Sequence, residues 1–104
     1  MKIGILCACA PEFEPYRATL GGESTFIHGM QRTDGVLYGH EISAVFCGIG
    51  KVNAALGAMT LIRDCGADRI IMSGVAGAIR HGVHIGQCIM ITDCIYHDLS
   101  PQLI

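Results

Sequence analysis

Residues 69–79 read RIIMSGVAGAI, and the two halves of this stretch decide the predicted fold. Residues 70–72 form a short apolar run without polar alternation, which is typical of a strand buried on both faces in a parallel sheet. Residues 73–78 are mostly small, so that a ligand could approach the backbone closely. Ligands of open α/β sheets bind beyond the carboxyl ends of the strands. We therefore predict a ligand on the backbone of residues 74–77, with a tight turn packed against a helix as the alternative.

The composition indicates one small, well-packed domain. The chain has 104 residues, of which 51% are hydrophobic and 15% charged, whereas globular domains average about 25% charged residues. This low charge suggests extensive burial, in an oligomer or against a further segment. The net charge of -2 gives no reason to expect nucleic acid or an anionic membrane as a partner. No apolar run reaches the ~18 residues of a membrane span, and the N-terminal run is too short for a signal peptide.

Six cysteines raise the question of a metal site or of disulfides: Cys7, Cys9, Cys47, Cys65, Cys88 and Cys94. Their spacing includes no C-x-x-C pair and fits no common zinc pattern. Free cysteine behaves as a small hydrophobic residue, and reduced thiols are usual in the cytoplasm. We therefore expect buried, reduced cysteines in a cytoplasmic protein, with no metal and no cofactor. A thiolate metal site, the alternative, would require stoichiometric zinc in the purified protein.

Apolar runs and turn residues divide the earlier part of the chain into further elements. A strand is predicted at residues 2–8 and a helix at about residues 11–20, because proline suits a first helical turn. Three short strands follow, at residues 24–29, 31–38 and 40–47, and Gly39 joins the last two in an antiparallel hairpin.

Glu12 lies in the first turn of the predicted helix and just past the end of the first predicted strand. The structural interpretation is that Glu12 and Glu14 only stabilise the helix start, where the helix dipole favours negative charge. The functional interpretation follows from the sheet. Parallel strands end at the same edge, so the Glu12 carboxylate should face the crevice that residues 74–77 line.

A second helix is predicted from about residue 50 to residue 65. An apolar face at helical spacing runs along it: Val52, Leu56, Met59 and either Ile62 or Arg63. The preceding Gly-Ile-Gly is not a dinucleotide fingerprint, since Asn53 stands in place of the third glycine, and no P-loop lysine pattern follows. Ile49 would offer an apolar side chain to the same crevice.

One more strand is predicted at residues 83–95, followed by Tyr96, His97 and Asp98. Adjacent residues of an extended chain point in opposite directions. His97 and Asp98 are therefore not expected to form a catalytic pair, and the functional prediction stays with Glu12 and the small-residue turn.

Three motifs, in this order and spacing, carry a resemblance to an enzyme family. They are MKIGILCA with Glu12 shortly after it, CGIGKVNAALGA at residues 47–58, and SGVAGA at residues 73–78 followed by YHD at residues 96–98. Together they resemble the N-terminal part of the 5′-methylthioadenosine/S-adenosylhomocysteine nucleosidases of the purine nucleoside phosphorylase/uridine phosphorylase superfamily. The resemblance spans the whole chain, and GIGKVNAA is its most specific part.

The resemblance implies an α/β fold, a three-layer α/β/α sandwich with a mixed, partly closed β-sheet, incomplete in this chain. It implies that residues 1–104 are the N-terminal portion of a single nucleosidase domain. The implied reaction is hydrolysis of the N-glycosidic bond between adenine and a 5′-thio-ribose, through an oxocarbenium-like transition state. The implied partners are a small-molecule nucleoside substrate and a second copy in a homodimer.

The same resemblance implies roles for individual residues. Glu12 falls on the family's water-activating carboxylate, which suits this chemistry. The positions near the substrate fall on five residues: Cys9, Ile49, Val75, Ala76 and Gly77. Cys9 replaces a methionine common there. Val75 replaces a serine whose hydroxyl helps to hold the water in many relatives, so Glu12 must act with other help.

Water is the better-supported nucleophile, because phosphate would need fixed cations and hydroxyls. The related phosphorylases place an arginine and a serine around the glycine turn, where this chain has Met72 and Val75. They also place an arginine in the helix after the first strand, where this chain has Glu12 and Glu14. Two carboxylates would repel phosphate.

The family domain is considerably longer than this chain. Its later half supplies a Met-Glu pair that binds the ribose hydroxyls and a Ser-Asp pair that protonates the purine, and neither motif occurs here. Residues 1–104 alone are therefore expected to show no nucleosidase activity. Two alternatives stay open: a hydrolase of another adenosine-like nucleoside, of the futalosine type, and a non-catalytic α/β binding or assembly module.

Overall fold

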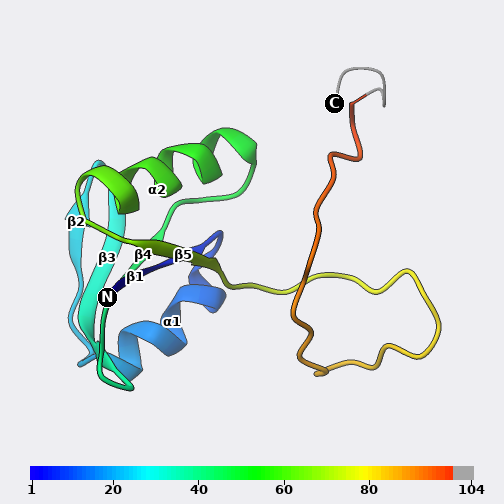
Figure 1. Ribbon diagram of the computed structural model, residues 1–104, viewed down its shortest axis with the longest axis horizontal. Coiled ribbons are helices and arrows are strands. Elements are labelled where there is room, and N and C mark those ends of the chain that lie inside the picture. Colours follow the sequence, from blue (N-terminus) through cyan, green and yellow to red (C-terminus); the bar gives the residue numbers. More distant parts are fainter. Residues whose placement is uncertain (100–104) are drawn as a thin grey trace.

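A computed structural model describes residues 1–99 as a five-stranded sheet with one helix on each face (Figure 1). In chain order the elements are β1 Lys2–Cys7, α1 Ala10–Thr19, β2 Thr25–Ile27, β3 Met30–Leu37, β4 His40–Phe46, α2 Lys51–Arg63 and β5 Arg69–Met72. The predicted α/β class, mixed sheet and layer order are confirmed. The expected partial closure is not found: over residues 1–99 the sheet is open, with β2 and β5 at its edges. Neither helix within residues 1–99 is long and apolar enough to cross a bilayer.

β1 lies inside the sheet, whose strand order is β2-β3-β4-β1-β5. It runs parallel to both neighbours, with Ile5 opposite Ala44 of β4 and Ile71 of β5. β2, β3 and β4 pair antiparallel. Because β1, β4 and β5 run in one direction, their carboxyl ends meet at the same edge of the sheet. The loops that follow these three strands form the candidate site.

Two hydrophobic clusters hold the helices on opposite faces of the sheet, since successive strand residues point to opposite sides. On the α1 face the buried residues are Ile5, Cys7, Phe13, Ile42 and Ala44. On the α2 face they are Leu6, Met30, Val45, Cys47, Leu61 and Cys65. Phe13 and Leu61 are completely enclosed and fix the two helices to the sheet.

Tight hairpins join β2 to β3 and β3 to β4. Their central residues are His28-Gly29 and Tyr38-Gly39, and all four have φ between 50° and 79°. Positive φ at both central residues defines the type I′ turn, whose twist matches that of the paired strands. The hairpin predicted at Gly39 is confirmed.

α2 packs on the sheet through the small residue Gly57 rather than through the apolar face noted from its helical spacing. The side chains of Val52, Leu56, Met59 and Ile62 are 50–75% exposed, and the buried residues of the helix are Gly57, Thr60 and Leu61. A Cβ at Gly57 would lie 2.5 Å from Leu6 Cδ1 and 2.7 Å from Cys47 Cβ. The helix crosses the sheet too closely at Gly57 for a larger residue, and the larger apolar side chains point outwards.

Residues 73–99 contain no helix or strand, so the strand predicted at residues 83–95 is wrong. The segment runs away from the sheet as a long loop (Figure 1), and most of its apolar side chains are exposed, Ile79 and Ile85 completely. A strand requires hydrogen bonds to a neighbouring strand, and within residues 1–99 none of the five strands pairs with this segment. Cys88 and Cys94, which were predicted to be buried, are exposed for the same reason.

Candidate active site

The Glu12 carboxylate bridges the ends of two parallel strands. Its Oε2 accepts a hydrogen bond from the backbone N–H of Ala8 (3.0 Å), and its Oε1 accepts one from the N–H of Val75 (3.1 Å). Ala8 follows β1 and Val75 lies shortly after β5. The predicted contact between Glu12 and the small-residue turn is therefore present, between residues 63 positions apart in the sequence.

The short connection from β1 to α1 places this carboxylate. Cys9 is the residue before the helix and has an extended backbone, with φ of −143°. Its carbonyl oxygen accepts hydrogen bonds from the N–H groups of Glu12 and Phe13, both at 3.2 Å. Pro11 occupies the first turn, where its missing N–H costs nothing. The helix thus begins almost at the strand end, and its first turn holds the Glu12 side chain at the sheet edge.

Gly74 leaves the space that the carboxylate occupies. A Cβ at this position would lie 2.7 Å from Glu12 Oε1 and 2.9 Å from Glu12 Cδ. The sequence predicted small residues here as room for a ligand against the backbone. In the structure, the room beside Gly74 is filled by Glu12 itself.

Hydrogen bonding favours the charged form of Glu12. The N–H groups of Ala8 and Val75 lower the pKa of the Glu12 carboxyl below its usual range, Cys9 contributes in the same direction, and partial burial opposes them. A carboxylate offers about four acceptor positions, and the two backbone N–H groups use only part of this capacity. Such an anion can orient a water molecule and stabilise a developing positive charge.

Cys7 and Cys9 flank Glu12. The Cys7 thiol donates to the carbonyl oxygen of Glu12 at 3.6 Å, and burial, followed by the negative charge of Glu12, raises the pKa of Cys7 to about 12. Thiolates, not thiols, act as nucleophiles and metal ligands. Cys7 is therefore a packing residue at neutral pH, while Cys9 is half-buried beside the carboxylate.

A second contact between α1 and the turn after β5 was not predicted from the sequence. The hydroxyl oxygens of Tyr16 and Ser73 lie 2.6 Å apart. Tyr16 follows Glu12 by four residues, so that both side chains lie on one face of α1. This spacing was the available signal, but it identified no partner for Tyr16.

The other predicted site residues lie in loops at the same sheet edge. Ile49 belongs to the loop between β4 and α2 and is 78% exposed. Ala76 and Gly77 directly follow Val75, and all three are exposed. The structure thus brings together Glu12, Cys9 and the backbone of Val75, and leaves the side chains of Ile49 and Val75 open to solvent.

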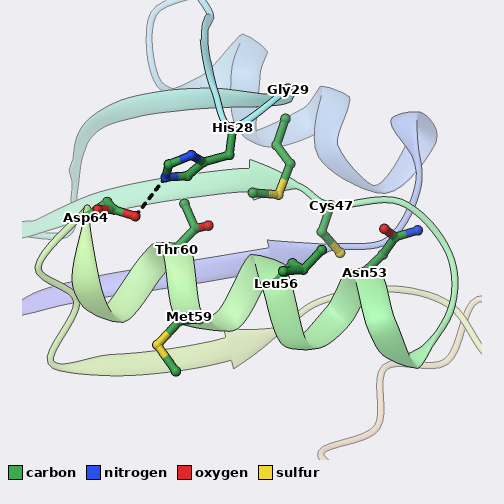
Figure 2. Close-up of a pocket in the computed structure, with 9 residues that line it drawn as sticks. His28, Gly29, Cys47, Asn53, Leu56, Met59, Thr60 and Asp64 are labelled. Atoms are coloured by element: carbon green, nitrogen blue, oxygen red, sulfur yellow. Dashed lines mark hydrogen bonds and ion pairs between the residues drawn. The ribbon is translucent and has the colours of Figure 1, made fainter.

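A hollow of about 520 Å³ lies between α2 and the β2–β3 hairpin, as Figure 2 shows. At one end of it, His28 Nε2 and Asp64 Oδ2 are 3.0 Å apart. Apolar side chains of Met30, Leu56 and Met59 contribute to its lining. This hollow is on the α2 face and shares no residue with the contacts of Glu12, so it is separate from the candidate active site.

His97 and Asp98 do not act as a pair in this structure. The Asp98 carboxylate accepts a hydrogen bond from Lys51 Nζ at 2.6 Å, and the same Nζ lies 4.7 Å from the centre of the Tyr96 ring. Within residues 1–99, no three side chains of His, Cys, Asp or Glu come close enough together to hold a metal ion.

The mixed sheet, with a carboxylate and a small-residue turn at the ends of its parallel strands, defines an α/β protein whose candidate site lies where ligands of such sheets usually bind. Residues 2–104 match the family profile described as the phosphorylase superfamily, and the chain belongs to this family.

Individual relatives agree with this assignment. A 5′-methylthioadenosine/S-adenosylhomocysteine nucleosidase of Bacillus cereus is 32% identical over 101 residues, covering 96% of this chain and 44% of the relative. The structure of the nucleosidase from S. pneumoniae with the transition-state inhibitor MT-ImmA matches with a TM-score of 0.77 and 32% identity, over 83% of this chain and 38% of that one. A futalosine hydrolase mutant of Helicobacter pylori matches with a TM-score of 0.72 and 32% identity, over 82% and 38%. The chain spans less than half the length of these relatives.

Proposed function

We propose that residues 1–104 are the N-terminal portion of a single nucleosidase domain. The proposed reaction is hydrolysis of the N-glycosidic bond of 5′-methylthioadenosine and S-adenosylhomocysteine, which releases adenine. The observation that carries this proposal is the Glu12 carboxylate, held by the N–H groups of Ala8 and Val75 at the ends of two parallel strands. The similarity to nucleosidases at 32% identity supports the substrate class.

Glu12 is proposed to activate the attacking water. As the bond to the base breaks, positive charge develops on the ribose, and an anion nearby stabilises that charge. The carboxylate then accepts a proton from the water as the new bond to C1′ forms. The lowered pKa of Glu12 means that the group is ready as an acceptor at neutral pH, and that it is unsuited to act as an acid.

Five further residues are proposed to bind the substrate: Cys9, Ile49, Val75, Ala76 and Gly77. Exposed apolar side chains at Ile49 and Val75 suit the ribose and the 5′-thioalkyl group. The backbone of the turn suits the polar atoms of the nucleoside. Because Val75 carries no hydroxyl, the water is expected to depend on Glu12 and on groups supplied from outside residues 1–104.

A second candidate is hydrolysis of futalosine or another adenosine-like nucleoside. The observation that favours it is the structural match to a futalosine hydrolase mutant, which is as similar in sequence as the nucleosidases are. Both candidates use the same bond cleavage and the same Glu12. They differ in the nucleoside that is cleaved, so a comparison of substrates separates them.

The test joins residues 1–104 to the remaining part of the Bacillus cereus nucleosidase and measures release of the free base from 5′-methylthioadenosine, S-adenosylhomocysteine and futalosine. We expect release that Glu12→Gln lowers by about 100-fold or more, in line with the loss of a general base. Glu14→Gln is the matched control, because Glu14 is exposed and pairs with Arg17 in the next turn. Equal activity of the Glu12→Gln variant and its parent would refute the role of Glu12. The 104-residue chain by itself is expected to release no adenine.

We also propose a cytoplasmic homodimer. The support for the dimer is the outward apolar face of α2, formed by Val52, Leu56, Met59 and Ile62, each at least half exposed. Covering such a patch with the same face of a second copy would remove it from water. The cytoplasmic location rests on the six unpaired cysteines.

A further inference from the structure

The turn that supplies the Val75 N–H to Glu12 lies at the edge of the sheet. Among residues 1–99, three hydrogen bonds tie residues 73–75 to earlier parts of the chain. The N–H of Ser73 donates to the Leu6 carbonyl oxygen at 3.0 Å, the Ser73 hydroxyl meets Tyr16, and the N–H of Val75 donates to Glu12. The Val75 side chain is 88% exposed, so packing contributes little to holding this turn.

Two of these three bonds come from α1. Glu12 and Tyr16 lie four residues apart on the same face of α1. Glu12 contacts Val75 and Tyr16 contacts Ser73, both in the segment after β5. The Tyr16–Ser73 distance of 2.6 Å is at the short end for two hydroxyl groups. Tyr16 also packs against the buried cluster on the α1 face, which fixes the direction of its ring. The Tyr16 hydroxyl therefore has a fixed position, and its hydrogen bond to Ser73 can hold residues 73–75 in place.

We propose that Tyr16 is a positioning residue, which acts through the Ser73 hydroxyl to hold residues 74 and 75 where the Val75 N–H reaches the Glu12 carboxylate. The inference rests on the proposed function, because Tyr16 would help to keep the proposed catalytic group, Glu12, hydrogen-bonded to the turn. Tyr16 is not assigned any contact with substrate. When the hydroxyl pair is lost, the turn is expected to swing away from α1, and the Glu12 carboxylate loses one of its two backbone donors.

A purely structural role for the pair would leave the state of Glu12 unchanged, and this difference defines the test. There are two readouts in the 104-residue chain. The first is the pKa of Glu12, measured by an NMR titration of its labelled carboxyl carbon. The second is the hydrogen-exchange rate of the Val75 amide. The other titratable groups that interact with Glu12 are Cys7, Cys9 and Cys47, and the pKa of Cys47 is raised by burial and by the charge of Glu12. Cys7, with its pKa raised to about 12, does not titrate in the acidic range where Glu12 is measured.

Tyr16→Phe removes the hydroxyl and keeps the ring. We expect the pKa of Glu12 to rise towards its usual range and the Val75 amide to exchange about tenfold faster, as for the loss of one ordinary hydrogen bond. Tyr38→Phe is the matched control, since Tyr38 is 93% exposed in a hairpin. It should leave both readouts at their wild-type values.

Ser73 supplies the second arm of the experiment, in case loss of the tyrosine hydroxyl unfolds the chain. Ser73→Ala should reproduce the effects of Tyr16→Phe, and Ser73→Thr, which keeps a hydroxyl, should restore both readouts. Wild-type values of the Glu12 pKa and of Val75 exchange in Ser73→Ala would overturn the inference. This outcome is distinct from failure of the proposed function, which the Glu12→Gln chimera tests by adenine release alone.

Discussion

At the scale of single residues, the site depends on how closely Glu12 and Gly74 approach each other. The carboxylate reaches Val75 only because no side chain stands at Gly74, where a Cβ would come within 2.7 Å of Oε1. The atoms that would clash belong to the end of a flexible side chain, and Gly74 is not among the residues with positive φ. A substitution there should therefore move Glu12 without breaking the fold.

Gly74→Ala is predicted to displace the carboxylate and break its bond to Val75, so that the pKa of Glu12 rises towards its usual range. Gly77→Ala is the matched control for this measurement, because a Cβ at Gly77 would meet nothing within 4 Å. The measurement is an NMR titration of Glu12 in the three chains. An unchanged pKa in Gly74→Ala, or an equal rise in Gly77→Ala, would contradict the geometry described for Glu12.

The lowered pKa of Glu12 also predicts how folding stability depends on pH. A carboxyl whose pKa is lower in the folded than in the unfolded chain stabilises the fold above its unfolded pKa, and the contribution is lost as the pH falls through the folded pKa. The difference in free energy of unfolding between the wild type and Glu12→Gln should therefore be largest near neutral pH and shrink in acid. Urea unfolding of both chains at a series of pH values measures it. A difference that stays constant into acid would show that the pKa is not lowered.

At the scale of the elements, α2 shows that close packing can override hydrophobic periodicity. The helix presents Gly57 and Leu61 to the sheet and turns its larger apolar side chains outwards. A glycine inside a helix costs about 1 kcal/mol relative to alanine. At Gly57 the contact with Leu6 and Cys47 leaves no room for the alanine Cβ.

Gly57→Ala is predicted to destabilise the chain, although alanine is the better helix former. Overpacking of a core costs ~1–3 kcal/mol, which should exceed the gain in helix propensity. Urea unfolding gives the free energy of both chains. Val52→Ala, in the same helix and 75% exposed, serves as the control and should change stability by no more than about 0.5 kcal/mol. Stabilisation by Gly57→Ala would mean that α2 lies farther from the sheet.

At the scale of the whole molecule, the fold leaves a large share of its apolar surface uncovered. The outward face of α2 and most apolar side chains of residues 73–99 are exposed, in a chain that spans less than half the length of these relatives. This explains the low charge content noted from the sequence. The hydrophobic residues exceed what one sheet and two helices can bury.

The proposed dimer makes a prediction at this scale. Leu56→Lys places a charge in the middle of the outward face of α2 and should weaken self-association by at least tenfold, measured by sedimentation over a range of concentrations. Val36→Lys is the control, since Val36 is similarly exposed on β3 but lies outside that face. Equal association of the two variants would exclude α2 as the contact between copies.

Most of the elements could be predicted from the sequence, because they depend on neighbouring residues. The apolar run after Met1, the proline in the first turn of α1 and the glycine hairpins each act within a few residues. The placement of Glu12 at the strand edge also followed, since it needs only the direction of the strands. The same local patterns predicted a strand at residues 83–95, but that segment forms no strand, because within residues 1–99 no other strand pairs with it.

The sequence by itself determined the order of strands and helices up to residue 72, the α/β class and the position of a carboxylate beside a small-residue turn. Only the tertiary structure decided which face of α2 is buried, that Gly74 makes room for Glu12, and that Tyr16 meets Ser73. The physical reason is that each of these depends on the distance between segments far apart in the chain. Tyr16 and Ser73, for example, are separated by 57 residues, and no local pattern specifies how closely their backbones approach.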